Sequence, residues 1–200
     1  AEVLQGMGVT VQGSDMSESD NTLTLRERGI PIHIGHSAAN VTDDIEFVIR
    51  TAAVHDDNPE VHEAHRRGIP VFERTQAWGA LMRGYPNALC ISGTHGKTTT
   101  TSMCTHIMMA AEKDPTVMIG GTLPLLHACH RVGKGNTIIM ESCEYYNSFL
   151  SLNPTIAVIL NIEADHLDFF KDIEDIKHSF RQFAERVPAE TGTVIANFDD

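Results

Sequence analysis

One stretch, residues 87–104, limits the possible folds more than any other part of the sequence. It reads Asn-Ala-Leu-Cys-Ile-Ser-Gly-Thr-His-Gly-Lys-Thr-Thr-Thr-Thr-Ser-Met-Cys, an apolar run followed by a glycine turn, a lysine and a helical pattern. This order is typical of a strand–loop–helix unit that binds phosphate. The glycines allow the backbone to approach a polyphosphate closely, and amides at the start of the following helix can bind it. Lys97 would add a positive charge for the terminal phosphates, and the Thr98 hydroxyl suits magnesium.

The spacing of this loop differs from the common one. The pattern Gly-x4-Gly-Lys-Ser/Thr needs glycine at position 91, where this chain has isoleucine. A plain glycine turn with an exposed lysine is the alternative, but Gly-Lys-Thr-Thr after an apolar strand favours phosphate binding. We therefore predict that the nucleotide-binding residues are Gly93, Thr94, His95, Gly96, Lys97, Thr98 and Thr99.

Two further predicted strands end close to this loop. Residues 136–140 lead to Glu144, and residues 155–160 lead to Asp165 and His166. Because the carboxyl ends of parallel strands meet at one edge of a sheet, these side chains should lie near Lys97. Carboxylate and hydroxyl oxygens suit magnesium, whereas imidazole is a less usual ligand for it. A surface position for Glu144 and a helix-capping role for Asp165 remain alternatives.

The first 85 residues alternate short strands with short helices. Strands are predicted at residues 9–13, 31–35, 46–50 and 69–72, which indicates a parallel, doubly wound sheet. We therefore predict an α/β chain with a Rossmann-like domain over residues 1–85 and a truncated P-loop-type α/β domain over residues 86–200. Asp15, at the end of the first strand, suits a ribose or base contact. A turn-forming role for Asp15 and a surface position for His36 are the alternatives.

Composition excludes some classes of function and indicates a compartment. Fifteen basic against 27 acidic residues give a net charge of −12, which argues against a nucleic-acid-binding surface. The four cysteines are far apart in the sequence, without a Cys-x-x-Cys pair, so we expect reduced thiols and a cytoplasmic protein. The sequence begins within a helical pattern and ends just after a strand-like run, so we expect an internal piece of a longer protein.

Three motifs together resemble the Mur ligase family, the ATP-dependent enzymes that build the peptidoglycan stem peptide. The short phosphate loop is the first, and its His95 resembles members acting on UDP-N-acetylmuramate. Residues 141–150, Glu-Ser-Cys-Glu-Tyr-Tyr-Asn-Ser-Phe-Leu, are similar to the family's magnesium-glutamate region. Residues 161–166, Asn-Ile-Glu-Ala-Asp-His, are similar to its Asn-Ile-x-x-Asp-His motif. The resemblance implies ATP and Mg²⁺ as cofactors, Lys97, Glu144 and His166 as catalytic residues, and Thr98, Glu144 and His166 as metal ligands.

The first segment resembles the uridine-nucleotide domain of the same family. The resemblance implies that substrate is bound by Ser14, Asp15, His36, Thr51 and Ala52 of this segment, and by Gly120 and Gly121 of the second segment. The implied small-molecule substrates are UDP-N-acetylmuramate, L-alanine and ATP. ATP would convert the muramate carboxylate into an acyl phosphate, to which L-alanine is then joined to form a peptidoglycan precursor. A sibling ligase of cell-wall recycling, which attaches a preformed peptide, is one alternative. A nucleotide-binding module without turnover is the other, because the amino-acid contacts are expected beyond residue 200.

Overall fold

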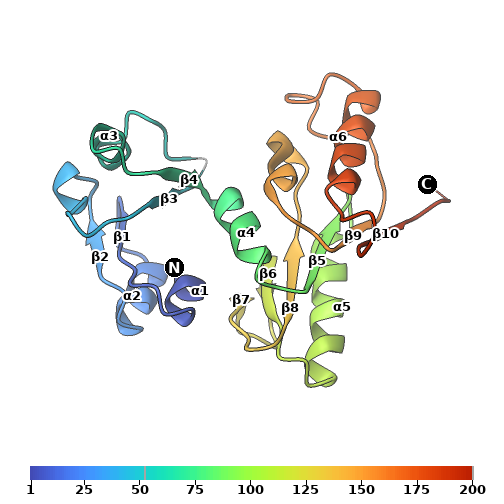
Figure 1. Ribbon diagram of the computed structural model, residues 1–200, viewed down its shortest axis with the longest axis horizontal. Helices are drawn as coiled ribbons and strands as arrows, with labels where there is room; N and C mark the ends of the chain where they lie inside the picture. Colours follow the sequence, from blue (N-terminus) through green and yellow to red (C-terminus); the bar gives the residue numbers. More distant parts are fainter. Residues whose placement is uncertain (52, 200) are drawn as a thin grey trace. The chain divides into compact units, whose positions relative to one another are not determined.

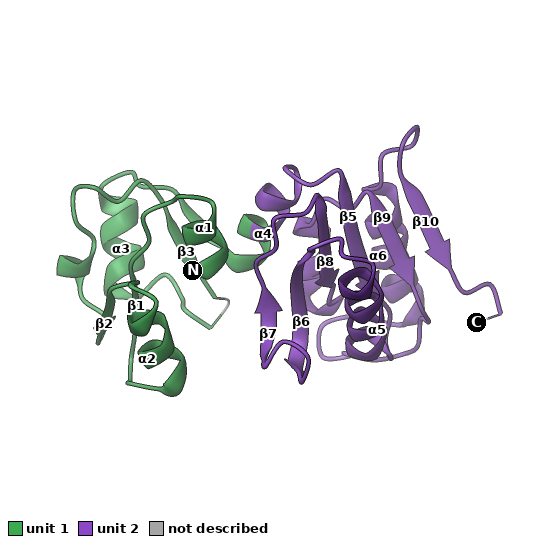
Figure 2. Ribbon diagram, turned by 90° about the horizontal axis from the view of Figure 1, so that it is seen from below, with its two compact units in different colours: residues 1–77 green, residues 78–200 purple. Residues whose placement is uncertain are grey.

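The structure is a computed structural model that describes residues 1–51 and 53–199. Contacts divide the chain into two compact units, Ala1–Ala77 and Trp78–Asp200, called unit 1 and unit 2 below (Figure 2). Strands alternate with helices in both units, so the predicted α/β fold class is confirmed. The domain boundary predicted between residues 85 and 86 stays a prediction.

Unit 1 contains two pairs of short parallel strands (Figure 1). β1 pairs with β2, and β3 pairs with β4. The helices connecting paired strands begin at side-chain caps, Ser19 for α2 and Asn58, followed by Pro59, for α3. In chain order the elements are α1 (Glu2–Gly6), β1 (Gly13–Asp15), α2 (Asp20–Glu27), β2 (Ile32–Ile34), the 3₁₀ turn η1 (Ala38–Asn40), β3 (Val48–Arg50), α3 (Pro59–Arg66) and β4 (Val71–Glu73).

The first strand lies later in the sequence than predicted. The alternating run at residues 9–13 indicated a strand, but the strand β1 begins at Gly13 and continues to Asp15. Its register pairs Gly13 with Ile32 and Asp15 with Ile34. A strand is defined by its hydrogen-bonded partner, and the register leaves Val9 and Val11 outside the pairing, so their alternation was misleading.

Unit 2 contains a six-stranded sheet in the order β10-β9-β5-β8-β6-β7. Every neighbouring pair is parallel except β6 and β7, which are antiparallel. After α4 (Arg74–Met82), the elements are β5 (Asn87–Ser92), α5 (Lys97–Ala110), β6 (Thr116–Leu123), β7 (Ala128–Arg131), β8 (Thr137–Glu141), the 3₁₀ segment η2 (Tyr145–Ser151), β9 (Ile156–Ile159), α6 (Ile173–Glu185) and β10 (Thr193–Ala196). Because β5 lies between β8 and β9, the ends of these three strands are adjacent.

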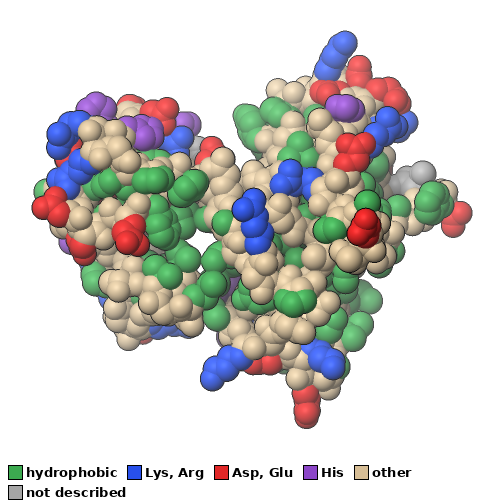
Figure 3. Space-filling view, viewed as in Figure 1, with side chains coloured by type: hydrophobic (Ala, Val, Ile, Leu, Met, Phe, Trp, Pro, Cys, Tyr) green, Lys and Arg blue, Asp and Glu red, His purple; other side chains and the backbone are tan. Residues whose placement is uncertain are grey.

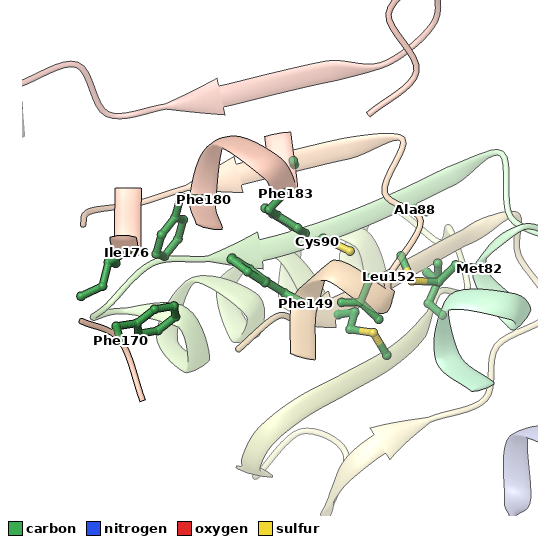
Figure 4. Packing of buried hydrophobic residues seen from close by; sticks show 12 residues of the cluster. Met82, Ala88, Cys90, Phe149, Leu152, Phe170, Ile176, Phe180 and Phe183 are labelled. Carbon is green, nitrogen blue, oxygen red and sulfur yellow. The ribbon is translucent and has the colours of Figure 1, made fainter. Parts of the chain in front are cut away.

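The sheet of unit 2 lies between two layers of helices (Figure 2). Successive strand residues point to opposite faces, so Leu89 and Ile91 pack with α5 on one face. Ala88 and Cys90 pack on the other face with α6 and η2. The second face is centred on three phenylalanines (Figure 4). The Phe149 ring stacks on the Phe183 ring at 4.6 Å and meets the Phe180 ring edge-on at 5.2 Å.

Charged side chains are distributed over the surface. On the face shown in Figure 3, lysine and arginine side chains are scattered among acidic and neutral ones. No broad basic patch is seen on this face of the described residues. Within residues 1–51 and 53–199, no helix is both long and apolar enough to cross a membrane.

Candidate nucleotide-binding site

The predicted phosphate loop connects β5 directly to α5. Two of its residues have left-handed backbone angles, with φ of +139° at Gly93 and +83° at Gly96. A Cβ atom on Gly93 would lie 3.0 Å from the Leu160 Cβ atom, so this position requires glycine for space as well as for conformation. Helix α5 begins at Lys97, so Thr98 and Thr99 lie in its first turn. Amides at a helix start are suited to bind an anion.

The Lys97 ammonium group points back into the loop and towards the end of β8. It donates hydrogen bonds to the Gly93 and Thr94 carbonyls at 2.5 and 3.1 Å. It also lies 3.1 and 3.3 Å from the two carboxylate oxygens of Glu144. The Glu144 side chain is only 3% exposed and that of Lys97 only 14%. A buried carboxylate needs such a cation beside it, so the structure joins two of the three predicted catalytic residues in one ion pair.

The third predicted catalytic residue, His166, lies on the other side of Glu144. Its Nε2 atom is 3.9 Å from Glu144 Oε1, too far for a direct hydrogen bond. The His166 imidazole stacks on the Tyr145 ring at 4.3 Å with an angle of 23°. The Tyr145 hydroxyl donates to Asp168, and this hydrogen bond raises the pKa of Tyr145. A short turn follows His166, and the next helix, α6, begins at Ile173, so Asp165 does not cap a helix.

Glu141, at the end of β8, is a neighbour of the loop that the sequence analysis did not assign to the site. Thr98 Oγ1 donates to one of its carboxylate oxygens at 2.9 Å. The Gly120 N–H group donates to the other at 2.6 Å. A Cβ atom on Gly120 would lie 2.6 Å from the carboxylate, so the Glu141 side chain would have to move to admit one. The predicted metal ligands Thr98 and Glu144 therefore have different partners in this structure.

The remaining predicted loop residues differ in exposure. Thr94 is buried, whereas His95 and Thr99 are exposed. His95 Nε2 is 3.7 Å from a Glu163 carboxylate oxygen. A Cβ atom on Gly121 would lie 3.7 Å from the Thr98 methyl group, so this glycine also lies beside the loop. The roles predicted for these residues in nucleotide and sugar binding stay predictions.

In unit 1, a second polar cluster lies at the ends of β1 and β2. Ser14 Oγ donates to Glu60 Oε2 at 2.5 Å and lies 3.1 Å from His36 Nδ1. His36 Nδ1 is 3.2 Å from the same Glu60 oxygen, and Asn40 donates to the other at 2.6 Å. Burial raises the pKa of Glu60, but the hydrogen bonds from Ser14, Asn40 and His36 outweigh burial and hold it below its usual value.

Asp15 and Thr51, which were also predicted to bind substrate, lie outside this cluster. Asp15 is exposed, and its carboxylate accepts a hydrogen bond from the Ser17 N–H group at 3.2 Å. Thr51 is exposed, and Ala52 lies outside the described residues. Glu60 was not among the predicted site residues, although an acidic residue in the first helical turn after Asn58-Pro59 was a signal for one.

Two family models cover nearly the whole chain. A model of the Mur ligase middle domain matches residues 91–200, which include the phosphate loop, Glu144 and His166. A model described as the catalytic domain of the Mur ligase family matches residues 1–86. The chain belongs to the Mur ligase family. The resemblance inferred from the three motifs is thus confirmed.

Curated Mur ligases resemble the chain along almost its full length. The UDP-N-acetylmuramate–L-alanine ligase of Agathobacter rectalis is 49% identical over 195 residues, which are 98% of this chain and 42% of the relative. The ligase of the same name from Caldicellulosiruptor saccharolyticus is 49% identical over 200 residues, 100% of this chain and 44% of the relative. The chain therefore spans less than half the length of the curated Mur ligases it matches.

Solved Mur ligase structures share the fold. The UDP-N-acetylmuramate–alanine ligase of Thermotoga maritima matches with a TM-score of 0.82 and 31% identity, over 98% of this chain and 45% of that one. The murein peptide ligase of Psychrobacter arcticus matches with a TM-score of 0.80 and 22% identity, over 97% of this chain and 45% of that one. The predicted Rossmann-like and ATP-binding architecture agrees with these neighbours.

Proposed function

We propose that the full-length protein is an ATP-dependent ligase that joins L-alanine to UDP-N-acetylmuramate in peptidoglycan precursor synthesis. The observation that carries the proposal is the phosphate loop, whose Lys97 is paired with the buried Glu144 and lies near His166. The relatives named for this reaction, 49% identical over nearly the whole chain, support the choice of substrates.

The chemistry of amide formation explains why such a ligase needs a phosphate loop. A carboxylate cannot expel oxide, so the lactyl carboxylate of the muramate must first become an acyl phosphate. The amine of L-alanine then attacks the acyl carbon, a tetrahedral intermediate collapses, and phosphate leaves. Phosphoryl transfer depends mainly on positioning and charge stabilisation. Lys97 would offset the negative charge of the transferred group, and His166 would lie on the side of the muramate carboxylate.

The residues beside the loop fit magnesium by their donor chemistry. Thr98 provides a hydroxyl, and Glu141 and Glu144 provide carboxylates, all hard oxygen donors of the kind that magnesium prefers. These three side chains would hold the ion, with His166 beside them. When bound, magnesium would neutralise charge on the phosphates. Within the described residues, no group of three or more His, Cys, Asp or Glu side chains is arranged to hold a metal ion, so phosphate oxygens would have to complete the coordination.

Unit 1 would supply the uridine side of the substrate site. The cluster of Ser14, His36 and Glu60 lies at the ends of two parallel strands, where α/β sheets bind ligands.

The four cysteines are free thiols, which agrees with a cytoplasmic enzyme. We therefore place the reaction in the cytoplasm.

An isotope experiment tests the proposed route. The full-length enzyme is given ATP, L-alanine and UDP-N-acetylmuramate labelled with ¹⁸O in its lactyl carboxylate. We expect one labelled oxygen in the released phosphate, because the carboxylate oxygen becomes the bridge of the acyl phosphate. The Lys97→Ala variant should form about 10²–10³-fold less product, the usual effect of losing one preorganised electrostatic contact. Unlabelled phosphate from an active ligase would contradict the acyl-phosphate route.

The choice of the amine substrate has its own test. The same assay is run with L-alanine and, separately, with the preformed tripeptide L-alanyl-γ-D-glutamyl-meso-diaminopimelate. We expect amide product with L-alanine. Product only with the tripeptide would instead assign the recycling reaction, and nucleotide binding without any product would leave a binding module.

A further inference from the structure

The side chain of Asn161 joins the end of β9 to the phosphate loop at two points. Its Oδ1 atom accepts a hydrogen bond from the His95 N–H group at 2.8 Å. Its Nδ2 atom donates to the His95 carbonyl at 3.1 Å. One side-chain amide thus binds both backbone polar groups of a single loop residue, as a neighbouring strand would.

The backbone next to Asn161 extends this contact along the loop. The Thr94 N–H group donates to the Asn161 carbonyl at 3.1 Å. The Glu163 N–H group donates to the Thr94 hydroxyl at 2.9 Å, and Thr94 is only 8% exposed. Residues 161–163 therefore run beside residues 94–95 and hold them in place. The remaining flanks of this short loop are the two left-handed glycines, Gly93 and Gly96, which by themselves favour disorder.

On the basis of the ATP-dependent function proposed above, we propose that Asn161 is a positioning residue for the phosphate loop. It holds the His95 peptide groups in place, and with them the turn that leads into α5, before the nucleotide binds. A loop that is already ordered loses less conformational freedom on binding, so its affinity is higher. Asn161 acts through His95 and needs no contact with the nucleotide.

The surroundings of Asn161 argue that this role is separate from core packing. The residue is partly exposed, and it also lines a cavity of about 590 Å³ bordered by residues of β9, β10 and α6. Shortening the side chain would enlarge an existing space and leave the two buried clusters of the sheet unchanged. A variant at position 161 should therefore fold and report on the loop.

The test compares Asn161→Ala with the wild type in the full-length protein. By calorimetry, we expect the affinity for ADP with magnesium to fall about tenfold, the order expected for two lost hydrogen bonds. The KM for ATP should rise by a similar factor, while the KM for UDP-N-acetylmuramate stays within about twofold. Amide hydrogen exchange at residues 93–96 should become faster, a change that a purely structural role elsewhere would not produce.

Two further variants keep the test decisive. Asn153→Ala is the matched control, because Asn153 Nδ2 also donates to a backbone carbonyl, that of Gly79, at 2.7 Å. It should leave ADP affinity unchanged. Asn161→Asp keeps the shape but loses the donor to the His95 carbonyl, so it should also bind ADP more weakly. This variant replaces Asn161→Ala should the latter fail to fold.

The outcomes separate this proposal from the proposed ligase activity. Wild-type ADP affinity and unchanged loop exchange in both position-161 variants would overturn the positioning role, even where the wild type makes the amide product. Weakened ADP binding in a protein that makes no amide product would support the positioning role and contradict the ligase assignment.

Discussion

The carboxylate of Glu60 is held ionised by neighbours from three different segments. Ser14 is the middle residue of β1, His36 comes shortly after β2 and Asn40 ends η1, and each contacts one of the two Glu60 oxygens. These contacts hold the pKa of Glu60 below its usual value in spite of burial. A pKa that is lower in the folded than in the unfolded state stabilises the fold only while the group is ionised. This contribution is present above the usual value of 4.5 and is lost as the pH falls through the lowered pKa.

We predict that replacing Glu60 by glutamine reduces the acid sensitivity of unit 1. The wild type should lose stability as the pH falls below about 4.5, the ordinary pKa of the group. Glu60→Gln should lose less over that range, because an amide gains no proton. The measurement is the urea midpoint of unit 1 at a series of pH values. Glu73→Gln, at an exposed position at the end of β4, is the control. Equal pH dependence in Glu60→Gln and the wild type would refute the prediction.

At the site, the sequence predicted the meeting of strand ends but not the pairing of side chains. Lys97, Glu144 and His166 lie together because the ends of parallel strands are adjacent. Glu141, which pairs with Thr98, ends β8, and Glu144 comes just before a turn in which Tyr146 and Asn147 have φ of +52° and +55°. Left-handed angles are uncommon for residues other than glycine, although asparagine adopts them more often than most, and the sequence pattern did not predict them at these positions. The structure was therefore needed to show that Thr98 pairs with Glu141 and that the Tyr145 ring stacks on His166.

Among the elements, those with clear end signals were predicted well, and those that depend on a partner were not. Helix α3 begins at Pro59, directly after the capping residue Asn58, and β5 coincides with the apolar run before the glycine turn. Strand β7 was missed because it follows a turn with proline and a left-handed His127, φ +49°, instead of a glycine signal. Its register with β6 also shifts between Met118 and Leu123. Such pairing is set by tertiary contacts, which a strand pattern alone does not contain.

The contact between α4 and η2 leads to a prediction about Gly79. A Cβ atom there would lie 1.9 Å from the Ser151 carbonyl oxygen, which belongs to backbone and cannot rotate away. Gly79→Ala should therefore lower the free energy of unfolding by about 1–3 kcal/mol, the usual effect of overpacking. The measurement is urea unfolding of the full-length protein.

Gly84→Ala is the control for this prediction. The nearest atom to a Cβ on Gly84 is the Leu81 carbonyl oxygen at 3.4 Å, an ordinary contact. This variant should stay within about 0.5 kcal/mol of the wild type. A similar loss in both variants would mean that the close approach of α4 to η2 does not limit stability.

For the whole molecule, the presence of two compact units predicts which part of the protein a bound nucleotide stabilises. ADP with magnesium at 100 times its Kd should stabilise the unit that binds it by about 2.7 kcal/mol. Hydrogen exchange should therefore slow for the most protected amides of β5 and β8 in unit 2, and remain unchanged in β1 and β2 of unit 1. Lys97→Ala should lose the effect. An equal slowing in both units would show that they unfold together, against this prediction.

The hydrogen bonds of Lys97 set a condition that an anion would have to meet to bind at the loop. Its ammonium group already donates to the Gly93 and Thr94 carbonyls and to the Glu144 carboxylate. Since an ammonium group has three N–H donors, an incoming anion must exchange with oxygens that are already bound. A halide ion offers one acceptor atom in place of the several oxygen atoms that Lys97 already contacts, whereas a terminal phosphate offers three oxygen atoms at once. The chain has a net charge of −12. This competition therefore favours ligands that present several oxygen atoms over ligands that carry negative charge but few acceptors.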